Sequence, residues 1–241
     1  MLHLDKQMSV KIHYKFYMND LEKFVVENGM EINTLKSKVM KFSRSAKPLS
    51  TKVSFRDNKN LEEIQQIKLL GLQISENLKW DSNTSFICKN ARRKIFLLRN
   101  MKNSGLSQSE LIDAYKKEVR SLLELAVPVW NSGLTQEQSL FIERVQKSAL
   151  AAILGPKYRS YEDALQLTNL DRLSIRREQM CLKFINKNLK SDNPLLKLVN
   201  KSYNTRSDTR SVEEFQCRTK SYFQSGLPYL ARLYNASLKS K

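Results

Sequence analysis

Two stretches, Gly29–Ser43 (GMEINTLKSKVMKFS) and Ile67–Trp80 (IKLLGLQISENLKW), decide how this chain is expected to fold. In the first, Lys38–Phe42 has the alternation of a short strand. In the second, Ile67–Ser75 is an apolar strand pattern interrupted by a glycine. A glycine inside a strand pattern predicts a bulge or a close approach of the backbone to another molecule. The first third of the chain is therefore expected to contain strands.

Helical patterns surround these strands. Residues 5–28 have helical spacing, with a stop at Asn28-Gly29. From Ser82 onward the pattern is helical, and capping boxes begin at Ser107 and Thr135. Later features are a helix stop at Gly155-Pro156, a helix over 171–190 whose expected apolar face is Ile175, Leu182, Ile185 and Leu189, and a polar linker beyond Asn200.

We therefore predict an α+β fold in three parts. Residues 1–80 form a small unit of one helix and several strands, including Lys52–Phe55. Residues 81–200 form a helical bundle, and residues 201–241 form a loop and a C-terminal tail.

The charge is strongly positive and unevenly distributed. The 241 residues include 42 Lys and Arg against 24 Asp and Glu, a formal net charge of +18. Residues 81–241 hold 28 basic and 15 acidic side chains and thus carry +13 of that charge. Such an excess favours a polyanionic partner, RNA or DNA, because each phosphate contact releases condensed counterions. A membrane surface is the competing polyanion.

The sequence points away from a membrane and from a disulfide framework. No apolar run approaches the roughly 18 residues that span a bilayer, and the first residues lack the apolar core of a signal peptide. We therefore expect an intracellular protein, in the nucleus or cytoplasm. Cys88, Cys181 and Cys217 are odd in number and widely spaced, which predicts free thiols and no zinc site.

The order of several motifs resembles one protein family over nearly the whole chain. The Gly29–Ser43 segment, followed by the strand with Leu70-Gly71, resembles the distal palm of reverse transcriptases encoded by non-LTR (LINE, jockey-like) retrotransposons. Lys79-Trp80-Asp81 with the basic run 89–99 is similar to the thumb of those enzymes, and the tail with Leu227–Leu230 to their C-terminal end. The resemblance implies a palm remnant over residues 1–80 and a thumb that holds a primer–template duplex.

The resemblance also implies what should be missing. A complete family member clamps Mg²⁺ between an Asp-Asp turn and a third aspartate. This sequence has no Asp-Asp dipeptide, and Asp5 and Asp20 are isolated. We expect no catalytic residue, no metal and no cofactor held by this chain, and no polymerase activity from it alone. An upstream polymerase segment that completes the enzyme is an open alternative.

Three places are candidates for nucleic-acid contacts. Lys36 and Lys38 are expected to leave the same side of an extended chain, as phosphate contacts or as solvated lysines. By resemblance, Leu70 and Gly71 match a primer-grip strand, and a simple bulge is the alternative. The strongest candidate is the helix over 81–102, which has no acidic residue from Ser82 to Gly105 and whose face opposite the apolar residues carries Lys89, Arg92, Arg93 and Arg99.

Two other classes of function stay open at this point. One is a helical protein-interaction module whose charge only aids solubility. The other is a general nucleic-acid binder reused by the host. Trp80 and Trp130 are expected to be core or anchor residues, since each has apolar neighbours and only exposed rings can stack on bases.

Overall fold

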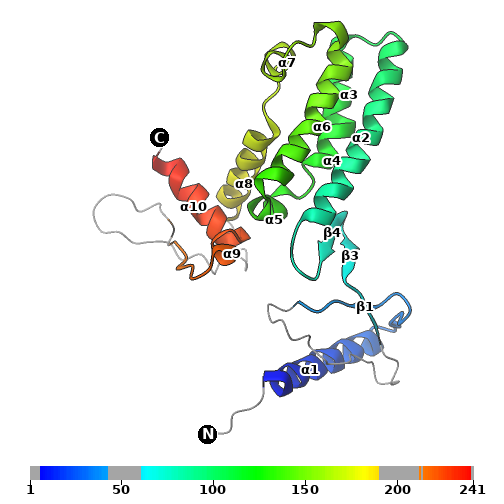
Figure 1. The fold of residues 1–241 in the computed structure, drawn as a ribbon. Helices are drawn as coiled ribbons and strands as arrows, with labels where there is room; N and C mark the ends of the chain where they lie inside the picture. The colour runs from blue at the N-terminus through cyan, green and yellow to red at the C-terminus, as the bar shows by residue number, and fades with distance from the viewer. Residues whose placement is uncertain (1–5, 43–60, 190–211, 213, 240–241) are drawn as a thin grey trace. The chain divides into compact units, whose positions relative to one another are not determined.

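The chain forms two compact units, Met1–Lys79 and Trp80–Lys241, in a computed structural model that describes residues 6–42, 61–189, 212 and 214–239 (Figure 1). The described residues are mostly helical with a few short strands, which agrees with the expected α+β class. The expected boundary at residue 80 lies beside the division between the units. The expected strand Lys52–Phe55 lies outside the described residues, and so does most of the polar linker after Asn200.

The first unit begins with helix α1 (Lys6–Glu27). Its end is formed by Gly29, which has a positive φ of 62°. The Met30 amide donates to the Val25 carbonyl at 2.9 Å and the Gly29 amide to the Val26 carbonyl at 3.1 Å, so the last carbonyls of the helix are satisfied. The predicted stop at Asn28-Gly29 is confirmed.

The strands of this unit are shorter than predicted and pair in two places. Strand β1 (Lys38–Val39) pairs in parallel with β2 (Glu62–Glu63). The prediction of a single strand over Ile67–Ser75, interrupted by Gly71, is wrong, because β3 (Gln66–Leu69) turns back into β4 (Leu72–Ser75) as an antiparallel hairpin.

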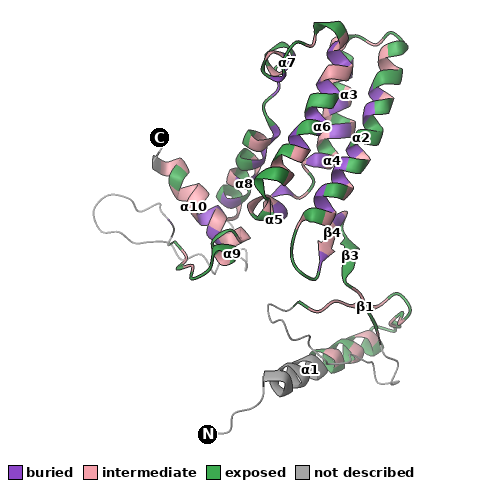
Figure 2. Cartoon of the chain, viewed as in Figure 1, coloured by how far each residue is buried: buried purple, intermediate pink, exposed green. Residues whose placement is uncertain are grey.

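The second unit is built around two long helices, α2 (Asp81–Asn103) and α6 (Gln136–Leu154), which pack along each other (Figure 1). A continuous helix lies against α2, formed by α3 (Gln108–Ala114), the π-helical η1 (Tyr115–Arg120) and α4 (Ser121–Leu123). The capping boxes predicted at the starts of α3 and α6 are both present. Figure 2 shows the buried residues of this unit on the helix faces that meet.

Shorter elements complete the second unit. They are α5 (Val127–Trp130), η2 (Asn131–Gly133), η3 (Gly155–Lys157), α7 (Tyr161–Thr168), α8 (Leu173–Leu189), α9 (Lys220–Phe223) and α10 (Gly226–Lys239). Helix α8 packs against α5, α6 and α10. Trp130 is fully buried, as predicted, and the ring of Trp80 covers Gly133, where a Cβ atom would lie 2.7 Å from that ring.

The apolar face predicted for α8 is wrong in part. Ile185 is buried, but Ile175 is 47% exposed. The buried side of the helix instead repeats every four residues and includes an arginine: Leu173, Arg177, Cys181 and Ile185. The sequence pattern missed this face because a charged residue occupies one of its positions.

A buried polar network joins the helices of the second unit. The Gln146 side chain on α6 accepts a hydrogen bond from the Tyr115 hydroxyl of η1. Its amide nitrogen donates to the Tyr161 hydroxyl and to the Asp171 carbonyl, both at 2.9 Å. The Tyr161 hydroxyl donates to Glu143, whose same oxygen accepts the Leu173 amide at 3.1 Å. Such a network fixes how the helices are placed relative to one another.

Candidate nucleic-acid interface

Helix α2 has two faces of opposite character, as its sequence predicts. Ile87, Ala91, Ile95 and Leu98 are buried, since 100° per residue brings them to the side that meets α6 and η1. Asp81 lies in the first turn, where a negative charge complements the helix dipole, and its carboxylate accepts from the Gln138 amide at 2.7 Å. The helix is therefore held firmly while its other face stays open.

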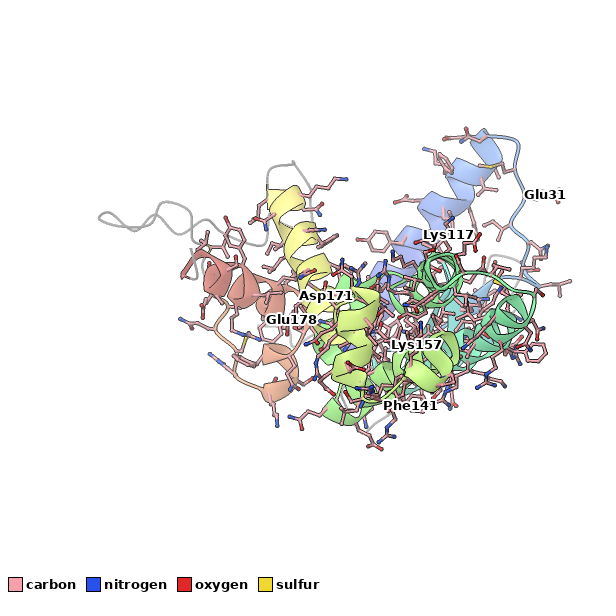
Figure 3. All side chains as sticks on the ribbon, turned by 90° about the horizontal axis from the view of Figure 1, so that it is seen from above. Glu31, Lys117, Phe141, Lys157, Asp171 and Glu178 are labelled. Carbon is pink, nitrogen blue, oxygen red and sulfur yellow. The ribbon has the colours of Figure 1, made fainter. Side chains whose placement is uncertain are left out.

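We call the opposite side of α2 the basic face, defined by Lys89, Arg92, Arg93 and Arg99, all exposed. In the part of the chain that the structure describes, Lys89, Arg93 and Arg99 form no ion pair. The Arg92 guanidinium lies 4.5 Å from the centroid of the Phe141 ring, labelled in Figure 3. A cation over a ring keeps its charge, so Arg92 is positioned but not neutralised.

Two other cations of α2 have structural partners. Lys94 pairs with Glu118 of η1 at 2.8 Å. The Lys102 ammonium donates to the Ala152 carbonyl at 3.0 Å, near the end of α6. A Cβ atom on Gly155 would lie 2.5 Å from that ammonium nitrogen, and Gly155 also has φ +58°. The glycine predicted as a helix stop thus also makes room for Lys102.

Phe96 is a part of this face that the sequence reasoning missed. Its ring is 64% exposed. On a helix its nearest surface neighbours are three and four residues away, and three of those four are Arg92, Arg93 and Arg99. The signal was available, because Phe96 falls outside the apolar arc of α2. An exposed ring among cations can stack on a base, or bury apolar area against a partner.

The structure places Lys36 and Lys38 differently from the prediction. Lys36 is exposed in a turn, where its amide donates to the Asn33 side chain at 3.0 Å. Lys38 lies in β1 and its ammonium pairs with Glu62 of β2. The expectation that the two side chains alternate along one extended strand is wrong, because the side chain of Asn33 favours a turn over a strand.

Leu70 and Gly71 form the two-residue turn of the β3–β4 hairpin. Both have positive φ, 48° and 88°, as the tight turns of hairpins require. Leu70 is 90% exposed. The glycine therefore serves the turn, and it is neither a bulge nor an interruption within a single strand.

The buried cysteines and the isolated aspartates offer little reactive or metal-binding chemistry. Burial raises the pKa of the thiols of Cys88 and Cys181 to about 11 in each case, which keeps them protonated and unreactive. Asp20 is exposed on α1, and Asp5 lies outside the described residues. Across the described ranges, no three His, Cys, Asp or Glu side chains gather closely enough to hold a metal ion. None of the helices described has the length and apolar character needed to cross a membrane.

The comparisons with known proteins add no family to this geometry. No family model, no curated protein and no solved structure matches the chain.

Proposed function

We propose that this chain binds nucleic acid through the basic face of α2, as the duplex-holding part of a reverse transcriptase of the non-LTR retrotransposon type. The observation that carries the proposal is the run of exposed cations on a helix without an acidic residue between Ser82 and Gly105. The family assignment rests on the resemblance of the sequence motifs. The proposed place of action is the nucleus or cytoplasm, where nucleic acid is found.

The physical basis is that exposed, unpaired cations release counterions when they meet phosphates. An exposed lysine or arginine that already has a carboxylate partner gains less, which is why Lys38 and Lys94 are left out of the interface. A solvated helix face usually mixes both signs of charge, whereas the face of α2 presents one. Because α2 is packed against α6, the basic face has a fixed orientation on the second unit.

A protein-interaction module is the alternative class, because an exposed phenylalanine such as Phe96 also suits a protein partner. The two classes differ in their response to salt. Binding through four phosphate contacts on duplex loses affinity with a slope of about −3.6 in log K against log salt. Contact through apolar area changes little over the same range.

The test is the affinity of the full chain for fluorescent oligonucleotides, measured by anisotropy between about 50 and 200 mM salt. An RNA–DNA hybrid, a DNA duplex and a single strand of equal length serve as ligands. We expect binding to all three with a steep salt slope and little sequence preference. Affinity that stays flat across this range, or no binding at the lowest salt, would contradict the proposal.

The catalytic part of the family activity is not assigned to these residues. The described residues do not fit a Mg²⁺ site of the family type, because Asp20 is isolated and exposed and the sequence has no Asp-Asp pair. Hard cations need several carboxylate oxygens at once. The proposal is therefore limited to holding nucleic acid.

A further inference from the structure

A pocket in the second unit lies away from the residues of the basic face. It has a volume of about 350 Å³ and is lined by residues of η2, α6, α8, α9 and α10. Most of the lining residues are polar, and they include Ser132, Thr135, Ser139 and Ser174, although polar and apolar atoms contribute about equally to the pocket surface. None of the residues of the basic face contributes to it.

Arg177 of α8 lines this pocket and is only 2% exposed. Its Nε donates to the Asn131 side chain at 3.0 Å and its Nη2 to the Ser139 hydroxyl at 2.6 Å. Both partners are neutral and both line the same pocket. The third nitrogen, Nη1, is buried and has no hydrogen-bond partner among the described residues. A buried guanidinium without a carboxylate partner is costly.

The nearby carboxylates do not pair with Arg177. Burial lowers the pKa of Arg177, and the fields of Glu143 and Glu178 raise that pKa only in part. Glu143 accepts from Tyr161 and from the Leu173 amide through Oε1, and its Oε2 is buried without a hydrogen-bond partner among the described residues. Glu178, labelled in Figure 3, lines the pocket but is exposed. In the described part of the chain neither forms an ion pair with Arg177.

Other groups at the pocket favour a negative charge. Arg232 of α10 lines it, held by a bond from its Nη2 to the Phe223 carbonyl at 2.6 Å and by the Phe223 ring 3.4 Å away. Thr135 and Gln136, at the start of the 19-residue helix α6, line it as well. The N-terminal end of a helix carries partial positive charge, although the capping box of α6 already uses the amides of Thr135 and Gln138. The pocket is thus lined by two arginines and by the first residues of a helix, and the carboxylate that lines it, Glu178, is exposed.

We propose that this pocket binds a phosphate group, with Arg177 and Arg232 as its cationic contacts and the surrounding hydroxyls as donors. A tetrahedral phosphate offers several acceptor oxygens, which suits donors that come from different elements. The group can belong to inorganic phosphate, to a nucleotide or to the 5′ end of a nucleic acid. The inference does not depend on the basic face of α2.

The experiment measures binding of sodium phosphate to the full chain by calorimetry and by thermal unfolding, with ionic strength held constant by sodium chloride. We expect saturable binding and a rise in the unfolding temperature that sodium acetate does not reproduce. Arg232→Gln should weaken the affinity about tenfold or more, the usual effect of losing a charged hydrogen bond. Arg177→Met should abolish binding.

Two controls separate this site from charge elsewhere. Arg159→Gln removes an exposed arginine that does not line the pocket and should leave phosphate binding unchanged. Substituting glutamine for the four cations of the basic face should also leave it unchanged, even where nucleic-acid binding is lost. If Arg177→Met does not fold, Arg232→Gln against Arg159→Gln decides the question. Equal affinity in that pair, or no saturable binding by the unmodified chain, would overturn the proposal.

The source of the phosphate is then identified with three further ligands. These are a deoxynucleoside triphosphate, a short oligonucleotide with a 5′ phosphate and the same oligonucleotide without one. Competition with inorganic phosphate by the triphosphate alone assigns a nucleotide, and competition that needs the 5′ phosphate assigns a nucleic-acid end. Competition by neither assigns free phosphate.

Discussion

At the scale of single residues, Gly155 ends α6 and leaves space for Lys102, and Phe96 places an exposed ring among the cations of α2. Gly155 followed by proline predicted the end of α6 correctly, because few residues other than glycine adopt its backbone conformation. Its second role, leaving space for Lys102, depends on a contact between α2 and α6 that no local pattern encodes. Phe96 stands out from the helical phase, yet only the structure shows that its ring is exposed.

The position of Phe96 leads to a prediction about single strands. Replacing Phe96 with leucine keeps an apolar side chain but removes the ring. On a single-stranded oligonucleotide we expect a loss of about 1–3 kcal/mol in binding free energy if one base stacks there. A duplex, whose bases are already stacked, should show little loss. The measurement is anisotropy at fixed salt for both ligands.

The matched control for this substitution is Phe96→Tyr, which preserves the ring and should retain single-strand affinity. Because the side chain is exposed, all three proteins should unfold at similar temperatures. If the leucine and tyrosine variants bind a single strand equally well, Phe96 does not stack on bases.

At the scale of elements, the long helices could be predicted, whereas the lengths and the pairing of the short strands could not. The capping boxes of α3 and α6 and the apolar stripe of α2 are local signals, and all three are present. The sequence predicts one strand in place of the β3–β4 hairpin, because the turn is Leu70-Gly71 and leucine rarely adopts a positive φ. The π-helical η1 also lacked a local signal, since its tyrosine is fixed by Gln146 of another helix.

The buried network yields a prediction about stability. In Tyr115→Phe the ring stays in the core, but the oxygen of Gln146 loses the hydroxyl that donates to it. A buried acceptor left without a partner costs about 1–3 kcal/mol in unfolding free energy. Urea unfolding followed by circular dichroism measures this change.

The control for this substitution is Tyr158→Phe, which removes the hydroxyl of a half-buried tyrosine outside the network. It should alter the unfolding free energy by less than about 0.5 kcal/mol. Equal stability of Tyr115→Phe and the unmodified chain would show that the hydrogen bond between Tyr115 and Gln146 does not hold η1 against α6.

At the scale of the whole molecule, the net charge does not determine which surface binds a polyanion. The sequence gives +18 and locates most of it beyond residue 80, which predicts a polyanionic partner but no particular surface. The structure distinguishes cations with carboxylate or carbonyl partners, such as Lys38, Lys94 and Lys102, from the residues of the basic face, which form no ion pair with the described residues. This difference depends on tertiary contacts, so composition alone could not supply it.

The most direct test of the proposed interface compares two variants of equal charge. In one, glutamine replaces the four residues of the basic face, Lys89, Arg92, Arg93 and Arg99. In the other, it replaces four exposed cations on η3, the loop before α7, and α8: Lys157, Arg159, Lys183 and Lys187. Thermal unfolding first checks that both remain folded, since exposed charges contribute little to stability.

The measurement is the slope of log affinity against log salt on a nucleic-acid duplex. We predict that the α2 variant loses up to about 0.9 of slope for each residue that contacts a phosphate, roughly 3.6 for all four. The second variant should lose far less, because its cations lie outside the basic face. Equal losses in both variants would contradict the account and would mean that net charge, and not this helix, makes the contact.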